Sequence, residues 1–249
     1  MTVEIIKGSK RISCAARRLS VSELPYKSIL LLPIPTSRDG ITVSGTDTTL
    51  EQLISRVDAS CAVCGYGLPK WFSERLSALG VTVYDALYDE DFQKKNAELT
   101  ALGVLGDIIC ERDAAPEAVR FGVIGYGRIG SVLVKYLATL GAHPIVFSER
   151  ASVRMALGEW GIESRRETSI EELSSLDVLI NTAPRCITDA SGAEMLHAAG
   201  VAVFDLASGE NFGGSEWVIR LGGVPDRVFP ESAGEAYAEA ICRCLCRGE

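Results

Sequence analysis

The chain has 249 residues, 47% of them hydrophobic and 23% charged, with a formal net charge of −8 at pH 7. These proportions exclude a disordered or low-complexity protein, and the scattered Lys and Arg residues leave no basic footprint for nucleic acid. No apolar run reaches the ~18 residues of a membrane span, and no apolar leader opens the sequence. Eight cysteines in a chain of this length fit a reducing compartment better than a disulfide framework. We therefore expect a cytoplasmic protein that contacts neither nucleic acid nor membrane.

The N-terminal half predicts short strands joined by helices. The first 27 residues give no clear pattern beyond one or two helical turns at 14–19. After them, apolar runs that end at Pro or Gly alternate with amphipathic segments. These runs predict strands at 28–33, 59–64 and 81–84, with one helix capped by Thr46 or Asp47 and another at 69–79.

A long helix is expected from Asp89 to Cys110, because its apolar residues recur every three to four positions. Gly103 and Gly106 each cost this helix ~1 kcal/mol relative to Ala. That cost suggests a helix face packed closely against a neighbouring element. The polar, Pro-containing stretch at 111–116 marks the expected domain boundary.

The second half repeats the alternation more regularly, which implies parallel strands joined by right-handed crossovers. We predict an α/β fold with a Rossmann-type, doubly wound parallel sheet and a smaller, flavodoxin-like βα domain. The domains are expected at 1–111 with the linking helix, at 112–231 for the dinucleotide-binding part, and at 232–249 for a C-terminal helix packing back on the first domain. Strands of the second sheet are expected at 120–124, 144–147, 162–165, 178–181 and 201–205.

A glycine-rich loop follows the first of these strands. Gly125, Gly127 and Gly130 form Gly-x-Gly-x-x-Gly between an apolar strand and an amphipathic helix. In the dinucleotide-binding fingerprint the first glycine allows a tight turn, the second lets backbone N–H groups approach a pyrophosphate, and the third lets helix and strand pack closely. The helix N-terminus adds N–H donors and partial positive charge. We predict that the loop binds a nicotinamide dinucleotide through Gly125, Tyr126, Gly127, Arg128, Ile129 and Gly130.

Residues 148–150 bear on the choice of cofactor. At the end of the second Rossmann strand, an acidic side chain binds the ribose hydroxyls and repels a 2′-phosphate. If Ser148 holds this position, its hydroxyl followed by Arg150 favours NADP(H). If Glu149 holds it, NAD(H) is favoured. Both alternatives stay open, with a small preference for NADP(H).

Polar residues at other strand ends complete the predicted site, since ligands of open α/β sheets bind at the carboxyl ends of the strands. Asp205 and Ser208 are candidates to hydrogen-bond nicotinamide or substrate. Arg38, which follows an earlier strand, is a candidate clamp for a carboxylate. Contact with the cofactor ribose is expected from Asn181, Thr182, Ala183 and Pro184.

The remaining chemistry-bearing residues give weaker patterns. The two histidines fall at helix-to-strand turns and are expected to face solvent. Cys61 and Cys64 lie on a predicted strand, so we interpret them as small buried hydrophobes rather than a redox pair. Cys242 and Cys246 share a helix face without a second ligand cluster, so no metal site is predicted.

The order of a βα domain, a linking helix, a Rossmann domain and a returning helix is similar to that of the D-2-hydroxyacid dehydrogenases. Those enzymes place an Arg after the fifth Rossmann strand and a His in a turn near the C-terminus. Here no Arg follows Ala207, and Glu231 stands where the His is expected. We reject that mechanism, because its acid/base group is missing.

A different set of motifs runs from about Ser22 to Leu245 and carries a closer resemblance. It comprises Leu32-Pro33, then Asn96, Thr100 and Gly103 on the linking helix, the cofactor loop, Ile180-Asn-Thr-Ala-Pro184, Phe204-Asp-Leu-Ala-Ser208, Gly223-Val-Pro225, Pro230, Ser232 and Ala233-Gly234. In this order the motifs resemble those of the bacterial dipicolinate synthase family, in its A component, an enzyme of spore formation.

The resemblance implies an oxidoreductase that converts a dihydropyridine dicarboxylate to dipicolinate with NADP. It implies a small carboxylated cyclic substrate held between the domains, and a partner in the form of a flavoprotein-like B subunit. A homo-oligomer is expected by analogy. Asp205, Ser208 and Arg38 are then the catalytic candidates, which would act by orienting the substrate.

The chain also departs from that family. The family opens with a strand and a Gly-Gly-Asp-x-Arg loop, and the roughly 20 residues available here show no such motif, which predicts a divergent, N-terminally shortened member. Leu102 replaces a Glu, and Gly-Glu-Asn-Phe-Gly-Gly replaces Arg-Pro-Gly-Gly after Ser208. Asp226 and Glu231 add negative charge near the expected dicarboxylate site. The alternative function is therefore a non-catalytic dinucleotide-binding subunit or sensor that has lost the substrate site.

Overall fold

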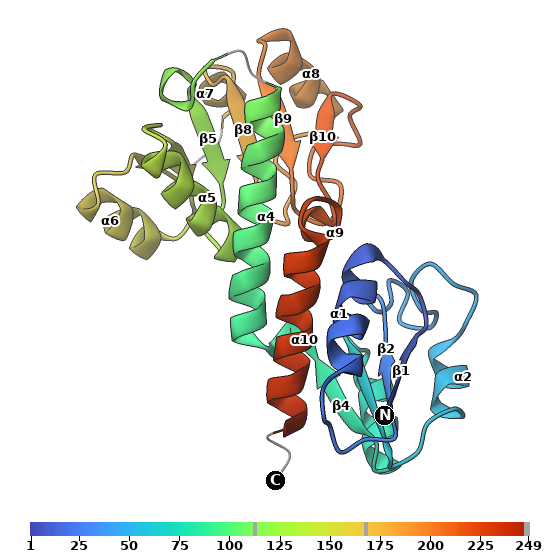
Figure 1. The fold of residues 1–249 in the computed structure, drawn as a ribbon. Helices are drawn as coiled ribbons and strands as arrows, with labels where there is room; N and C mark the ends of the chain where they lie inside the picture. The colour runs from blue at the N-terminus through green and yellow to red at the C-terminus, as the bar shows by residue number, and fades with distance from the viewer. Residues whose placement is uncertain (112–113, 167–168, 247–249) are drawn as a thin grey trace. The chain divides into compact units, whose positions relative to one another are not determined.

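The computed structural model describes residues 1–111, 114–166 and 169–246. The chain divides into two compact units, of which the first comprises Met1–Leu99 and Pro225–Glu249 and the second comprises Thr100–Val224. The first of these divisions falls inside the long helix α4 (Glu90–Cys110), which is drawn in green in Figure 1. The stretch 111–116, where we expected the boundary, follows the end of that helix.

The first unit is built on a four-stranded parallel sheet with the strand order β1-β2-β3-β4. Neighbouring residues of a strand lie in two different clusters of buried hydrophobic side chains, because successive side chains of a strand point to opposite faces of the sheet. Ile29 and Leu31 lie in the cluster formed with α1 and α10, whereas Leu30 lies in the cluster formed with α2 and α3. The elements of this unit are β1 (Thr2–Ile5), α1 (Lys10–Ser20), β2 (Ser28–Leu31), α2 (Leu50–Ile54), β3 (Cys61–Gly65), α3 (Lys70–Ala78), β4 (Thr82–Asp85), η1 (Ala86–Tyr88) and α10 (Pro230–Cys246), together with α9 (Val224–Val228), all but the first residue of which belongs to this unit.

The opening strand β1 (Thr2–Ile5) corrects the sequence-based interpretation of the first 27 residues. It pairs in parallel with β2, and its residues Val3 and Ile5 pack against the core. Helix α1 (Lys10–Ser20) follows and is longer than the one or two turns expected. An opening strand is therefore present in the stretch that showed no clear pattern.

Two details of the first unit also differ from expectation. Helix α2 is capped by Thr49, whose hydroxyl accepts a hydrogen bond from Gln52 N, rather than by Thr46 or Asp47. The Thr46 hydroxyl instead donates to the carbonyl oxygen of Val43 within the preceding turn. The other detail concerns Gly106 of α4, which is exposed and would have no atom within 4 Å of an added Cβ, so this glycine does not mark a close packing face.

Helices α1 and α10 lie side by side in the first unit (Figure 1). At Gly234 the helices come so close that an added Cβ would lie 2.5 Å from Cβ of Cys14 and 2.7 Å from the carbonyl oxygen of Arg11. One turn further along α10, the ring of Tyr237 is completely buried and lies 5.5 Å from the ring of Phe92 on α4. A small residue thus brings α10 into the core of this unit.

The second unit contains a six-stranded parallel sheet in the order β10-β9-β8-β5-β6-β7. With the strands numbered from β5, this is the doubly wound order 3-2-1-4-5-6 of dinucleotide-binding sheets, so the predicted α/β fold class is confirmed. The edge strand β10 was not predicted. The elements are β5 (Phe121–Ile124), α5 (Arg128–Thr139), β6 (Ile145–Phe147), α6 (Ala151–Glu159), β7 (Ser164–Arg165), α7 (Ile170–Leu173), β8 (Val178–Asn181), α8 (Ala190–Ala198), β9 (Ala202–Asp205) and β10 (Val218–Arg220), with η2 (Pro116–Ala118) before β5.

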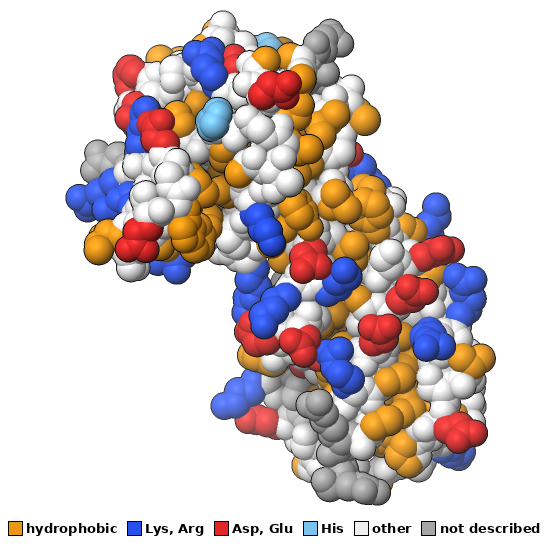
Figure 2. Space-filling model, turned by 60° about the vertical axis from the view of Figure 1, so that its left-hand side comes forward, with side chains coloured by type: hydrophobic (Ala, Val, Ile, Leu, Met, Phe, Trp, Pro, Cys, Tyr) orange, Lys and Arg blue, Asp and Glu red, His pale blue; other side chains and the backbone are white. Residues whose placement is uncertain are grey.

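The surface carries charges of both signs side by side, as the space-filling view of one face shows (Figure 2). Within the described residues, no helix has the length and apolar character needed to cross a membrane.

Candidate functional site

The glycine-rich loop lies at the point where the strand order of the second sheet reverses. Strand β5 pairs with β6 on one side and with β8 on the other, and the loop leaves its carboxyl end. In open α/β sheets this switch point is where ligands bind, since the neighbouring connections run to opposite faces and leave a crevice. The topology therefore places Gly125–Gly130 at the expected binding position.

A different structural feature favours glycine at each of the three glycine positions of this loop. Gly125 has a positive φ of 91°, which favours glycine over other residues. Gly127 is exposed, and no atom lies within 4 Å of the place where its Cβ would be. A Cβ on Gly130 would clash with the carbonyl oxygen of Gly125 and lie 2.9 Å from Oγ1 of Thr182. The loop is thus closed on the protein side and open on the side from which a ligand would approach.

Helix α5 begins at this loop without an internal cap. Gly127 is its N-cap residue, and it provides no side-chain cap for the first turn. In the same unit, by contrast, Ser169 caps α7 and Asp189 caps α8 through side-chain oxygens. Because a helix N-terminus carries N–H donors and partial positive charge, an uncapped α5 suits an anionic group such as a pyrophosphate.

The loop after β6 presents Ser148 and Glu149 differently. Ser148 is only 7% exposed, and its N–H continues the pairing to Arg165 O at 2.9 Å. Glu149 is the first exposed side chain after the strand, and its carboxylate pairs with Arg185 at 3.5 Å. Glu149 is therefore the acidic group available at the position that reads the adenosine ribose in dinucleotide-binding sheets.

Arginines surround that position. Arg150 donates a hydrogen bond of 2.6 Å to the carbonyl oxygen of Tyr126 in the glycine loop. Arg154 donates to the carbonyl oxygens of Ser148 and Glu149 at 2.7 and 2.8 Å. Together with Arg185, these guanidinium groups outnumber the single carboxylate.

The residues after β8 are held within the protein. Thr182 Oγ1 donates to the carbonyl oxygens of Ile124 and Gly125 at 2.9 and 3.3 Å. Asn181 is completely buried, and its side chain both accepts from Ala183 N and donates to Ala183 O. These side chains fix the shape of the glycine-rich loop. Of the residues expected to touch ribose, Asn181 ends β8, and Thr182, Ala183 and Pro184 follow it beside that loop.

Asp205 is the centre of a buried polar network at the end of β9. Its side chain is 3% exposed and accepts hydrogen bonds from Asn181 Nδ2 at 2.8 Å and from Asn211 Nδ2 at 3.1 Å. The N–H of Ala207 donates to the same carboxylate at 3.2 Å. Amide donors thus surround Asp205, and sequence reasoning missed Asn211, which lies in the departing stretch Gly-Glu-Asn-Phe-Gly-Gly.

The other two catalytic candidates differ in where the fold places them. Ser208 lies on the loop after β9, near Asp205 in sequence, and its carbonyl oxygen accepts a weak bond of 3.4 Å from Asn211 Nδ2. Arg38 belongs to the first unit, on the loop after β2, whereas Asp205 and Ser208 belong to the second. Within the second unit, therefore, the structure brings only Asp205 and Ser208 of the three together.

The loop of Arg38 is shaped by its neighbour Asp39. Hydrogen bonds from the Thr42 hydroxyl and from the N–H groups of Ile41 and Thr42 hold the pKa of Asp39 well below its usual value. The indole N–H of Trp71 donates to the carbonyl oxygen of Gly40 at 3.1 Å and ties the loop to α3. Arg38 is thus carried on an ordered turn.

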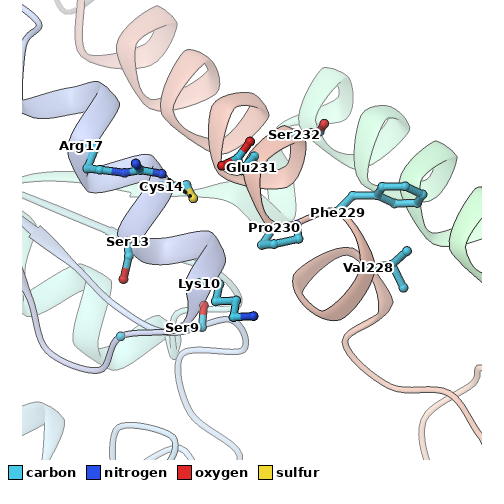
Figure 3. Close-up of a pocket in the computed structure, with 11 residues that line it drawn as sticks. Ser9, Lys10, Ser13, Cys14, Arg17, Val228, Phe229, Pro230, Glu231 and Ser232 are labelled. Carbon is cyan, nitrogen blue, oxygen red and sulfur yellow. Dashed lines mark hydrogen bonds between the residues drawn. The ribbon is translucent and has the colours of Figure 1, made fainter.

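A second concave region lies in the first unit, between α1 and the start of α10 (Figure 3). Its volume is about 810 Å³. Arg17 extends from α1 toward Glu231 of α10, and its Nη2 donates to Sγ of Cys14 at 3.2 Å. The polar residues of its lining are Ser9, Lys10, Ser13, Arg17, Glu231 and Ser232.

The cysteines and histidines lie largely as expected. Cys61 and Cys64 are buried on β3, and burial raises the pKa of the Cys64 thiol. His143 and His197 are exposed, and the His197 ring stacks on Trp217 with the ring centroids 3.8 Å apart. Among the residues that the structure describes, no three His, Cys, Asp or Glu side chains are grouped to hold a metal ion.

Comparison with known proteins defines the class of fold first. Neither family models nor curated protein sequences match this chain. Solved structures do, among them D-lactate dehydrogenase from Treponema pallidum at a TM-score of 0.52 and 12% identity, covering 100% of this chain and 97% of that chain. The layout similar to the D-2-hydroxyacid dehydrogenases is therefore confirmed as a fold.

Three other solved structures match this chain with higher TM-scores than that lactate dehydrogenase. The dipicolinate synthase A chain from Bacillus halodurans has a TM-score of 0.77 and 22% identity over 99% of this chain and 98% of that one. The A chain from Bacillus subtilis has a TM-score of 0.77 and 17% identity over 99% and 96%. A transhydrogenase from Sinorhizobium meliloti follows at 0.65 and 17% over 98% and 92%. At these identities the matches show a shared fold, and at that level they support the resemblance to the dipicolinate synthase A chain.

Proposed function

We propose that the protein is a nicotinamide-dinucleotide-dependent oxidoreductase of the dipicolinate synthase A type. The observation that carries the proposal is the loop Gly125–Gly130, which is closed toward the protein at Gly130 and open toward a ligand at Gly127. The uncapped start of α5 supplies N–H donors for the pyrophosphate. The bound cofactor would accept a hydride at C4 of its nicotinamide.

The proposed reaction is the oxidation of dihydrodipicolinate to dipicolinate. The substrate gives one hydride to NADP⁺ and releases one proton, so that NADPH and the aromatic ring are formed. Within the second unit, we assign contact with the reacting groups to Ser208, and Asp205 positions the loop that carries it. The proposal also includes a homo-oligomeric assembly that works with a flavoprotein-like B subunit.

NADP(H) is the proposed cofactor because of the charges near the end of β6. Arg150, Arg154 and Arg185 lie around one exposed carboxylate, Glu149, so the local charge is positive. A 2′-phosphate is attracted by guanidinium groups and repelled by Glu149. The carboxylate of Glu149 therefore limits the preference for NADP(H) over NAD(H).

Calorimetric titration with NADPH and NADH tests the cofactor. The substitution Glu149→Gln removes the repelling charge and leaves Arg185 without its carboxylate partner, so NADPH affinity should rise about tenfold relative to NADH. Glu159→Gln, near the end of α6, is the matched control and should leave the ratio unchanged. Tighter binding of NADH than of NADPH by the Glu149→Gln variant would contradict the proposed role of this residue.

Turnover tests the reaction. Reduction of NADP⁺, followed by the absorbance of the reduced nicotinamide, is expected when dihydrodipicolinate is added, alone or with a B subunit. If both nucleotides bind but neither is reduced, the oxidoreductase proposal fails. If neither nucleotide binds, the function proposed for the glycine loop fails as well.

A non-catalytic dinucleotide-binding sensor is the second candidate. One observation favours it: the only carboxylate proposed for catalysis, Asp205, is buried among amide donors and committed to holding loops together. Binding of a nucleotide at micromolar concentration without turnover under the same conditions is the expected result for this candidate.

A further inference from the structure

Arg185 is a charged residue that the sequence-based interpretation of the site did not include. It lies four residues after the end of β8, and its Nη1 pairs with Oε1 of Glu149 at 3.5 Å. Glu149 in turn lies two residues after the end of β6. The two side chains are 40% and 68% exposed, so a ligand in solution can reach both of them.

This ion pair crosses the switch point of the second sheet. Strand β5 lies between β6 and β8, and the glycine-rich loop leaves its carboxyl end. An ion pair between the loops after β6 and β8 therefore spans the crevice at the end of β5. In dinucleotide-binding sheets the adenosine ribose binds there, next to the acidic residue that follows the second strand. Arg185 thus meets Glu149 at the position expected for the 2′-oxygen of that ribose.

The two other arginines near this position are bound to the backbone. Arg150 donates to a carbonyl oxygen of the glycine-rich loop at 2.6 Å, and Arg154 donates to two carbonyl oxygens of the loop after β6 at 2.7 and 2.8 Å. Among the described residues, by contrast, the guanidinium of Arg185 has a carboxylate partner and no carbonyl partner. Arg185 can therefore turn toward a ligand without releasing either loop.

The chemistry of Arg185 suits a phosphate. A guanidinium has several N–H donors, and in the described part of the chain only Nη1 of Arg185 is in an ion pair. A phosphate monoester carries more than one negative charge at neutral pH and accepts parallel hydrogen bonds from a guanidinium. Exposed ion pairs contribute little to stability, so a small reorientation of Arg185 away from Glu149 costs little.

We propose that Arg185 sets the cofactor preference, because it shields the carboxylate of Glu149 and donates hydrogen bonds to the 2′-phosphate of NADP(H). Without Arg185, Glu149 would bind the ribose hydroxyls of NAD(H) and repel a 2′-phosphate. The inference rests on the proposed function, since it requires a nicotinamide dinucleotide at the glycine-rich loop. It assigns the deciding charge to the loop after β8 rather than to the loop after β6.

A second ion pair of the same sheet provides the matched control. Arg120 pairs with Asp177 at 2.9 Å, and these residues directly precede β5 and β8 at the opposite edge of the sheet. Arg120→Gln and Arg185→Gln therefore remove the same charge from partly exposed ion pairs at opposite ends of the sheet. Arg185→Lys is the conservative variant, which keeps the charge but loses the forked geometry.

The experiment is calorimetric titration of the full chain with NADPH and with NADH. Arg185→Gln should lower the ratio of NADPH affinity to NADH affinity about 10- to 100-fold, the loss expected for a charged hydrogen bond. Arg185→Lys should lower it about threefold, and Arg120→Gln should leave it within about twofold. Adenosine 2′,5′-bisphosphate and adenosine 5′-phosphate should show the same changes, because the difference lies in the adenosine half of the cofactor.

A double-mutant cycle tests whether Arg185 acts through Glu149. In the Glu149→Gln background, Arg185→Gln should lower the affinity ratio only about three- to tenfold, because no carboxylate is left to shield. A purely structural role of Arg185 would weaken the binding of both nucleotides equally and would not depend on residue 149.

Several outcomes would overturn the proposal. They are an unchanged affinity ratio in Arg185→Gln, an equal loss for both nucleotides, an equal change in Arg120→Gln, and the same change with and without Glu149. Both nucleotides still bind in these cases, so the proposed function survives them. If the unmodified chain binds neither nucleotide, the proposed function fails and this inference fails with it. Should Arg185→Gln not fold, Arg185→Lys decides, and an unchanged ratio in that variant counts against Arg185.

Discussion

At the scale of single residues, Gly127 and Gly130 have different structural roles, although the sequence motif does not distinguish them. Gly130 is required by the protein itself, because a side chain there meets the backbone of Gly125. Gly127 meets no atom of the described chain, and its φ of −93° suits any residue. The physical reason for a glycine at 127 is then space for something outside the chain. This contrast makes the nucleotide proposal testable apart from stability.

Substitution of each glycine by Ala should therefore give different results. Gly127→Ala is expected to fold with an unchanged melting temperature and to lose about tenfold or more in nucleotide affinity. Gly130→Ala is expected to lose about 1–3 kcal/mol of stability through overpacking. Calorimetric titration and thermal denaturation measure the two effects. A Gly127→Ala variant that binds nucleotide as well as the unmodified chain would argue against a pyrophosphate at this loop.

At the scale of elements, the ends of β8 and β9 are joined by one buried carboxylate. Asp205 receives donors from Asn181 at the end of β8 and from Asn211 in the loop after β9. Buried polar groups stabilise a fold when all their partners are present and destabilise it when one is lost. Asp205 is therefore a structural centre of the strand ends beside the glycine-rich loop.

The substitution Asp205→Asn tests that role. An Asn amide turns one accepting oxygen into a donor that faces Asn181 or Asn211, which should cost about 1–3 kcal/mol of stability. Ser208→Ala, three residues later on the loop after β9, should leave stability unchanged. Chemical denaturation compares the two variants. Equal stability of Asp205→Asn and the unmodified chain would mean that the network is dispensable.

At the scale of the whole molecule, two units with separate cores share one chain. The first unit contains the buried Arg11, and the second contains the glycine loop and the Asp205 network. Each unit can serve as the internal reference for the other when a ligand is added.

Hydrogen exchange followed by mass spectrometry should show this division. NADPH is expected to give its largest protection at amides 125–131 and 148–150, with much smaller changes at 9–20 of α1. The physical reason is that bound phosphates accept hydrogen bonds from the α5 N-terminus and slow its opening. If the largest protection falls in α1 instead, the nucleotide site has been placed in the wrong unit.

Features of this molecule could be predicted from the sequence only where they leave a local pattern of residues. The loop Gly125–Gly130 was predicted because glycine type and spacing directly reflect backbone contacts. Strands β1 and β10 were missed, since edge strands of three or four residues show no long apolar run. Arg11 was missed because a charged residue gives no sequence sign of burial. Tertiary packing alone produces that burial.

The placement of Trp71 has a practical consequence. Of the chain's three tryptophans, Trp160 and Trp217 lie in the second unit and Trp71 alone lies in the first. Its indole is tied to Gly40, on the turn that carries Arg38. A chain with Phe at the two other positions would emit from a single fluorophore, so the intensity and wavelength of its emission would follow the first unit in real time.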